Sequence, residues 1–182
     1  MICKNTNKDE NNNMRVPSDQ SKTNYLRMKR LERIALFPGS FDPITRGHES
    51  IIKRAIPMFD KIIVAVGVNS EKESLFPLSK RVYWLNAVFK DFDTVEVDTY
   101  TGLTVDYCKE KGIKYILRGL RTSADFEFER SIGQMNKQMY PEIETVFLLT
   151  TPEHTAINSS IIRDIIRQKG DPSNFIPKEV QL

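Results

Sequence analysis

The chain has 182 residues, of which 40% are hydrophobic and 28% charged, a size and composition that fit one domain with a buried core and exclude both disorder throughout and a pair of catalytic domains. No apolar run approaches the roughly 18–20 residues of a membrane-spanning helix, and the N-terminus lacks the apolar stretch of a signal peptide. The formal net charge of +3 arises in residues 1–33, which hold eight Lys or Arg and four acids; the rest has nineteen basic and twenty acidic groups, a balance that predicts no nucleic-acid partner.

Residues 1–30 differ in composition from the remainder of the chain. They are rich in Asn, Lys, Ser and Asp and have almost no apolar periodicity, so burial cannot offset the entropy lost on ordering them. We therefore expect a disordered tail over residues 1–30 and one folded domain over residues 31–182. A native start at Met28 is a second interpretation of the same segment.

From Ile34 onward, short β-branched runs alternate with stretches of helical period. Strands are predicted at Ile34–Phe37, Lys61–Val68, Thr94–Thr99, Tyr115–Leu117 and Thr145–Thr150. Helices are predicted at His48–Phe59, Ser79–Lys90 with Ser79 as N-cap, Leu103–Lys111, Ala124–Met139 and Ser160–Gln168. This order predicts an α/β fold, a single-domain Rossmann-like five-stranded parallel sheet with helices on both faces. Ligands of such sheets bind where the strands end, so we expect the chemistry there.

The segment that joins the first predicted strand to the first predicted helix reads FPGSFDPITRGH over residues 37–48. Gly39 allows a ligand to approach the backbone closely, and Gly47 and His48 open a helix whose N–H groups and dipole attract phosphate. The segment matches neither the dinucleotide-binding GxGxxG pattern nor a P-loop. An ordinary turn in which His48 caps the helix is the alternative.

That segment resembles the (H/T)xGH signature of the nucleotidyltransferase superfamily, and specifically the PGxFDPxTxGH opening of the bacterial phosphopantetheine adenylyltransferases. Two more motifs follow in the same order. Residues 118–129, RGLRTSADFEFE, resemble that family's RGLR…ADFEYE stretch, and residues 157–163, INSSIIR, resemble its ISSSxxR helix start. The resemblance extends from about residue 33 to residue 180.

The resemblance implies transfer of AMP from ATP to 4′-phosphopantetheine, which yields dephospho-coenzyme A and pyrophosphate in coenzyme A biosynthesis, with Mg²⁺ accompanying ATP. It also implies a homo-hexamer and feedback inhibition by coenzyme A. The N-terminal residues, which lack the apolar stretch of a signal peptide, predict a cytoplasmic location. Nucleotidyl transfer depends on alignment and charge stabilisation, and the acceptor phosphate is itself the nucleophile, so the lack of a Ser/His/Asp or Cys/His set is consistent with it. We expect no metal-ligating side chains, because Cys3 and Cys108 match no zinc spacing, and no nucleic-acid or membrane partner.

Matching the motifs residue by residue assigns roles within the site. Catalytic roles fall on His48, Lys72 and Arg118. Acceptor contacts fall on Ser40, Lys72, Thr104 and Arg118. ATP contacts fall on Ser40, Phe41, His48, Gly119, Leu120, Arg121, Glu129, His154, Thr155, Ala156, Ile157, Asn158, Ser159 and Ser160. We expect His48 to donate to an α-phosphate oxygen as charge develops in the transition state.

The chain departs from the family pattern at His154, where many relatives carry an aromatic residue, and at Asn158, which replaces the first serine of ISSS. Without the resemblance, Lys72 is a solvated loop lysine and Arg121 is an ion-pair partner of Asp125 or Glu129. Three alternative functions stay open: adenylation of nicotinamide mononucleotide, synthesis of a CDP-alcohol, and a catalytically silent nucleotide-binding regulator. The first two usually carry HxGH, whereas this motif begins with threonine.

Overall fold

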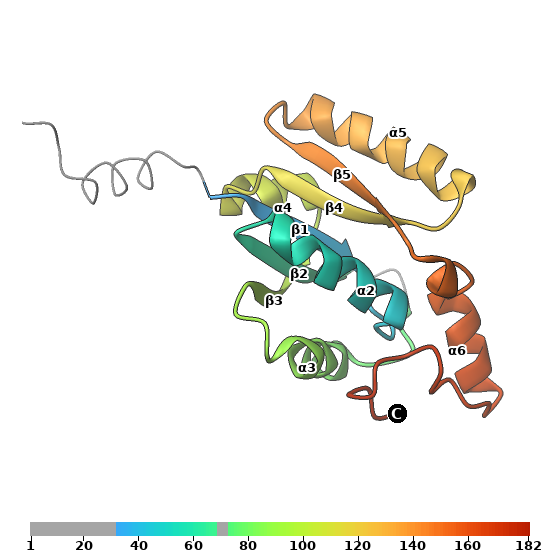
Figure 1. Ribbon diagram of the computed structural model, residues 1–182. Coiled ribbons are helices and arrows are strands. Elements are labelled where there is room, and N and C mark those ends of the chain that lie inside the picture. Colours follow the sequence, from blue (N-terminus) through green and yellow to red (C-terminus); the bar gives the residue numbers. More distant parts are fainter. Residues whose placement is uncertain (1–31, 69–72) are drawn as a thin grey trace, which may run out of the picture. The chain divides into compact units, whose positions relative to one another are not determined.

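The computed structural model describes residues 32–68 and 73–182, so the predicted tail over residues 1–30 and the candidate Lys72 lie outside the described residues. Five strands form one sheet: β1 (Ile34–Gly39), β2 (Lys61–Val68), β3 (Val95–Thr101), β4 (Tyr115–Leu120) and β5 (Glu144–Leu149). Neighbouring strands are all parallel, in the order β3-β2-β1-β4-β5 (Figure 1). The predicted α/β fold with a five-stranded parallel sheet is confirmed.

Four of the five predicted strands end at other residues. β3 ends at Thr101 instead of Thr99, β5 ends at Leu149 instead of Thr150, and β1 and β4 are both longer than the local pattern indicates. β1 continues past Phe37 to Gly39, which pairs with Val66 of β2. β4 continues past Leu117 to Leu120, which pairs with Leu149 of β5. Pairing with a neighbouring strand satisfies backbone groups beyond the point where the apolar run stops. Residues 118–120 therefore lie within β4 and not after it.

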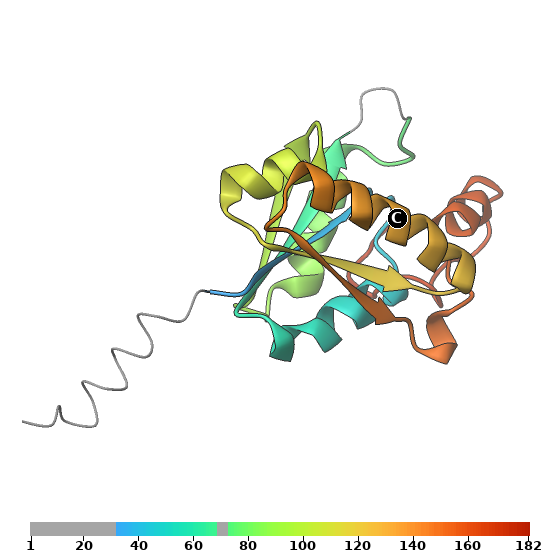
Figure 2. The ribbon, with the colours of Figure 1, turned by 90° about the horizontal axis from the view of Figure 1, so that it is seen from above.

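The helices are α2 (Arg46–Ala55), α3 (Leu78–Phe89), α4 (Thr104–Lys111), α5 (Ser123–Met139) and α6 (Ser159–Arg167), with 3₁₀ turns η1 (Ile56–Met58) and η2 (Pro152–His154). Apolar side chains of α2 and α3 pack on one face of the sheet in a large cluster that includes Ile52 and Trp84. Tyr107 and Cys108 of α4 pack on the opposite face. α5 lies over β4 and β5 (Figures 1 and 2), where Phe126 contacts Phe147. Helices on both faces are thus confirmed.

Helix starts differ from the prediction because of their caps. α2 begins at Arg46, two residues before the predicted start, because the Thr45 side chain accepts from the backbone N–H of His48. The N-cap of α3 is Pro77, whose carbonyl accepts from Arg81, so Ser79 is not the cap. α6 likewise begins one residue early, capped by Asn158. Side-chain caps and prolines fix these boundaries more strongly than apolar period does.

The segment after α6 returns to the core, which its sequence did not indicate. Ile176 and Val180 are buried in the same cluster as α2 and α3. Arg46 binds this segment, since its backbone N–H donates to the Phe175 carbonyl over 2.9 Å and its Nε donates to the Ile176 carbonyl over 3.1 Å. The C-terminal segment therefore braces the first turn of α2.

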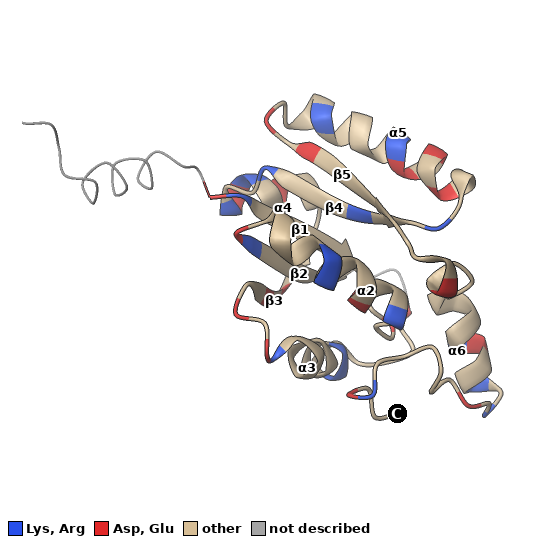
Figure 3. Ribbon diagram, in the orientation of Figure 1, with Lys and Arg blue, Asp and Glu red and all other residues tan. Residues whose placement is uncertain are grey.

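Basic and acidic residues are interspersed along the helices and strands (Figure 3). Several form pairs between helix neighbours, such as Lys53 with Glu49, and such exposed pairs contribute little to stability. Across residues 32–68 and 73–182, no helix is long and apolar enough to cross a membrane.

Candidate active site

A cavity of about 500 Å³ lies at the carboxyl ends of β1, β4 and β5. Its walls include the first-turn residues of three helices: Gly47 and His48 of α2, Ala124 and Asp125 of α5, and Ser159 of α6. The first N–H groups of a helix and the positive end of its dipole favour anions. Three helix N-termini around one cavity give it the electrostatic character that favours a polyanionic ligand.

His48 is oriented by the residue that caps its helix. The Thr45 backbone N–H donates to His48 Nδ1 over 3.2 Å, and Thr45 Oγ1 lies 3.1 Å from the same nitrogen. Since Nδ1 accepts from the amide, the proton of the neutral ring is on Nε2. Nε2 has no partner among the described residues, so it is a donor available to a ligand in the cavity.

Two aromatic rings pack against the His48 imidazole. The ring centroid of Phe41 lies 5.3 Å away at an interplanar angle of 75°, and that of Phe37 lies 6.2 Å away. Burial, and to a smaller extent the positive charges of Arg118 and Arg121, lower the pKa of His48 from 6.5 to about 4. The ring is therefore neutral at physiological pH, so Nδ1 remains the acceptor of the Thr45 N–H and the proton stays on Nε2.

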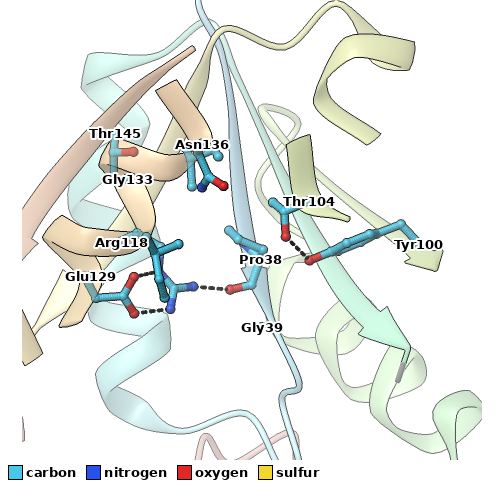
Figure 4. Close-up of a pocket in the computed structure, with 11 residues that line it drawn as sticks. Pro38, Gly39, Tyr100, Thr104, Arg118, Glu129, Gly133, Asn136 and Thr145 are labelled. Atoms are coloured by element: carbon cyan, nitrogen blue, oxygen red, sulfur yellow. Dashed lines mark hydrogen bonds and ion pairs between the residues drawn. The ribbon is translucent and has the colours of Figure 1, made fainter. Parts of the chain in front are cut away.

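Arg118 lies at the boundary of the cavity, on the side of the sheet that α5 covers (Figure 4). Its Nε donates to Glu129 over 2.8 Å, its Nη2 also pairs with Glu129, and its Nη1 donates to the Pro38 carbonyl over 2.8 Å. Both partners hold the guanidinium in one orientation. A planar cation fixed in this way suits a phosphate monoester.

Arg121 is a second fixed cation of the cavity. Its Nε and Nη2 bind the Asp125 carboxylate at 3.1 and 3.0 Å, and its Nη1 donates to the Ile157 carbonyl over 3.4 Å. Burial alone would raise the pKa of Asp125, but the hydrogen bonds from Arg121 lower it below its usual value. Arg121 thus both forms the ion pair with Asp125 that its sequence position allows and lines the cavity.

A second cavity of about 200 Å³ adjoins the first and shares Pro38, Gly39, Arg118 and Glu129 with it. Beyond these residues, it is lined by Tyr100, Thr104, Ile116, Ile132, Gly133, Asn136 and Thr145 (Figure 4). The hydroxyl groups of Tyr100 and Thr104 lie 2.9 Å apart, and Thr145 Oγ1 is buried without a hydrogen-bond partner. The cavity thus offers a narrow, mostly apolar space with a few polar groups, next to the fixed Arg118 guanidinium.

Most of the site residues predicted from the sequence line one of these cavities. The larger cavity brings together Ser40, His48, Arg118, Gly119, Arg121, Glu129, His154, Ile157, Asn158 and Ser159, and the smaller cavity includes Thr104. Phe41, Leu120, Thr155, Ala156 and Ser160 lie outside both walls. Phe41 and Leu120 are buried, and the Ser160 hydroxyl accepts from Arg163.

Several wall residues were not foreseen. In the larger cavity they include Asp125, Phe128 and Thr150, and in the smaller cavity Tyr100 and Asn136. Thr150 could have been found, because it is a polar residue directly after an apolar strand. Asn136 lies 13 residues into α5, where nothing local distinguishes it from a solvated helix residue.

Known protein families match both the sequence and the fold. The cytidylyltransferase-like family matches residues 36–165. The chain is 52% identical over 150 residues to the phosphopantetheine adenylyltransferase of Flavobacterium psychrophilum, a match that covers 82% of this chain and 99% of that protein. It is 48% identical over 150 residues to the phosphopantetheine adenylyltransferase of Leptospira biflexa, covering 82% and 94%.

Among solved structures, a bifunctional NMN adenylyltransferase/ADP ribose pyrophosphatase from Francisella tularensis superposes with a TM-score of 0.63. The sequence identity is 16%, and the match covers 80% of this chain and 45% of that protein. At this identity the likeness establishes the fold alone. That fold is consistent with the parallel α/β sheet observed here.

Proposed function

The chain belongs to the phosphopantetheine adenylyltransferases, and on that premise we propose that it transfers AMP from ATP to 4′-phosphopantetheine in coenzyme A biosynthesis. The observation that carries the proposal is the larger cavity, in which three helix N-termini, two fixed arginines and the Nε2–H of His48 surround one space. The reaction joins an oxygen of the acceptor phosphate to the α-phosphorus of ATP. The bond from that phosphorus to the oxygen that bridges the α- and β-phosphates breaks, and pyrophosphate leaves.

His48 stabilises the transition state of this displacement. Its neutral ring donates from Nε2 to a non-bridging oxygen of the α-phosphate, where negative charge is concentrated as the bonds exchange. Because Thr45 holds Nδ1, the donor is oriented before ATP arrives. The acceptor phosphate is an anion, so the reaction requires neither a covalent intermediate nor a protein base.

The two cavities divide the substrates between them. ATP occupies the larger cavity, with its phosphates toward the N-termini of α2 and α6 and contacts to Ser40, Gly119, Arg121, Glu129, His154, Asn158 and Ser159. The pantetheine arm occupies the smaller cavity beside Thr104. Arg118 lies on the wall that both share, where it would bind the phosphate of the acceptor, together with Lys72 from the segment outside the described residues.

Mg²⁺ is proposed to enter with ATP. The carboxylates that line the larger cavity, Asp125 and Glu129, are each paired with an arginine, so they do not fit as direct ligands of the ion. Mg²⁺ in nucleotide sites takes many of its ligands from substrate phosphates and water. When bound it would neutralise charge on the triphosphate.

A homo-hexamer and a cytoplasmic location are part of the same proposal. Phe128, Ile132, Met135 and Met139 are exposed at spacings of four, three and four residues, so they form one apolar stripe on α5. Contiguous exposed apolar surface of this kind marks contact sites.

Feedback inhibition by coenzyme A is also part of the proposal, since that molecule carries both an adenylyl group and a pantetheine arm and could fill both cavities.

Pyrophosphate release with defined pairs of substrates tests the proposed function. The purified protein is incubated with Mg²⁺, with ATP or CTP, and with 4′-phosphopantetheine, nicotinamide mononucleotide or glycerol 3-phosphate. Release only with ATP and 4′-phosphopantetheine, with dephospho-coenzyme A as the second product, is expected. Release with another pair would overturn the assignment of the acceptor, and ATP binding without release would indicate a silent regulator.

A further inference from the structure

Two charged side chains are buried behind the larger cavity without lining it. Asp42 is 3% exposed and Arg81 is 5% exposed, and neither is on the wall of either cavity. Charged groups are rarely buried this deeply unless they are paired and hydrogen-bonded. The catalytic role proposed above for His48 leaves both of them unexplained.

The hydrogen bonds of Arg81 and those of Asp42 both connect the turn after β1 to the residues at the start of α3. Arg81 Nη1 donates to the Ser40 carbonyl over 2.7 Å, and its Nε donates to the Phe76 carbonyl over 3.0 Å. The Asp42 carboxylate accepts from the backbone N–H groups of Leu75 and Phe76 over 2.7 and 2.9 Å. The turn after β1 is thereby joined on both sides of Phe41 to the start of α3.

Phe41, between these two anchored residues, has an unusual conformation and a central contact. Its φ angle is +45°, in the left-handed region that non-glycine residues rarely adopt. Its ring lies edge-on to His48, with ring centroids 5.3 Å apart. The ring also fills the space beside Gly39, where an added Cβ would lie 2.9 Å from the Phe41 ring. Phe41 thus connects the anchored turn to the imidazole.

We propose that Asp42 and Arg81 are positioning residues for AMP transfer, which hold the turn at Phe41 so that its ring fixes the imidazole of His48 for the α-phosphate. Neither residue touches the substrates. A third contact supports the same turn, since Arg163 Nη1 of α6 donates to the Asp42 carbonyl over 3.3 Å. The kinetic part of this proposal rests on the proposed function, whereas its structural part does not.

A role in stability alone does not account for this arrangement. Burial of charged side chains is often no more stabilising than burial of apolar residues of the same volume, because desolvation offsets the gain. Here the hydrogen bonds of Asp42 and Arg81 maintain a left-handed residue that packs against His48, a donor whose direction matters. A displacement of about 1 Å can cost 10²-fold in rate when the reacting groups must be aligned.

The histidine resonances allow a direct test, because the chain contains two histidines. The ring-current shift that the Phe41 ring imposes on the His48 Cε1–H signal reports how the two rings lie. Histidine-labelled protein is compared by NMR at pH 7.5 as wild type, Arg81→Lys, Asp42→Asn and Phe41→Leu. His154, which is bonded to Thr151, supplies the reference signal, and His48→Gln assigns the other.

Arg54→Lys is the matched control. Arg54 lies in the last turn of α2, whose first turn contains His48. Its Nη1 also donates to a backbone carbonyl, that of Leu149, over 2.7 Å. Its substitution removes an equivalent bond without touching the turn after β1. Ile113→Ala, a core change in the cluster on the opposite face of the sheet, serves as a second control for lowered stability.

We expect Arg81→Lys and Phe41→Leu to shift the His48 signal, to leave the His154 signal in place, and to lower kcat by about 10- to 100-fold with the KM for ATP changed less than about threefold. Both controls should keep the wild-type signal and kcat. A folded Arg81→Lys protein with an unmoved His48 signal would overturn the proposal, whether kcat falls or not. If Arg81→Lys does not fold, Phe41→Leu and Asp42→Asn decide by the same criterion. Wild-type protein without transfer activity would refute the proposed function, and the NMR comparison would still decide the positioning.

Discussion

The backbone amide of Thr45 donates to Nδ1 of His48 over 3.2 Å, so one residue both caps α2 and selects the tautomer of the imidazole. The same threonine side chain accepts from the His48 backbone N–H. A helix start thereby orients a neutral donor toward a cavity that suits phosphates. This relationship joins local helix chemistry to the transfer of AMP and leads to the first two predictions.

Replacement of His48 by Ala should lower kcat by about 10²–10³, because it removes a preorganised donor to the transition state. The KM for ATP should change much less, since the helix N-termini and the arginines remain. Steady-state kinetics with both substrates varied measures the two effects separately. Wild-type kcat in a folded variant would contradict the role of His48.

Stability should also depend on the protonation of His48. Its pKa of about 4 in the folded protein lies below the ordinary value of 6.5, so the unfolded chain binds a proton more readily as the pH falls. The free energy of unfolding should therefore lose about 2 kcal/mol from this group between pH 7 and pH 5. Urea titrations of wild type and His48→Gln isolate the contribution, because the other titratable groups are common to both. Parallel pH dependences would refute the lowered pKa.

Arg118→Lys should weaken the binding of 4′-phosphopantetheine more than the binding of ATP. Lysine retains the charge but cannot hold the two-point contact with Glu129 and also reach the Pro38 carbonyl. We expect the KM for 4′-phosphopantetheine to rise about tenfold, as for the loss of one charged hydrogen bond. Arg130→Lys is the control, since Arg130 pairs with Glu127 on the exposed side of α5. Equal increases in KM for both substrates would place Arg118 elsewhere.

The apolar stripe on α5 should mediate subunit contacts. Met135 is 62% exposed, and a glutamate there would place a charge within the stripe. Met135→Glu should lower the mass of the assembly measured by analytical ultracentrifugation. Gln134→Glu, at the preceding residue and outside the stripe, should not. An unchanged mass in Met135→Glu would exclude the stripe as a contact surface.

The C-terminal segment should be essential to stability. Ile176 is 3% exposed, and Ile176→Ala should cost about 2–4 kcal/mol of the free energy of unfolding through lost burial and the cavity left behind. Leu182→Ala, at an exposed position of the same segment, should stay within about 0.5 kcal/mol. Urea denaturation of both variants measures the difference, and similar losses would mean that the segment does not brace the core.

Much of this protein is determined by local sequence. The alternation of β-branched runs and helical periods predicted the parallel sheet, because each pattern depends on neighbours only a few residues apart. Gly47 and His48 after the first strand, and an arginine in the apolar run of β4, indicated where phosphate chemistry would lie. Strands of a parallel sheet bring their carboxyl ends to one edge, so these separate motifs had to meet.

Tertiary structure alone decided which groups hold the site in place. The bond from Arg118 to the Pro38 carbonyl spans 80 residues, and that from Arg81 to the Ser40 carbonyl spans 41 residues. Every residue has a backbone carbonyl, so no pattern in the sequence predicts which carbonyl a distant arginine will bind. Burial of Asp42, the left-handed turn at Phe41 and the return of the C-terminal segment likewise depend on packing between elements. Local periodicity determines the fold, whereas the exact positions of the site side chains depend on contacts that form only when the sheet and its helices are assembled.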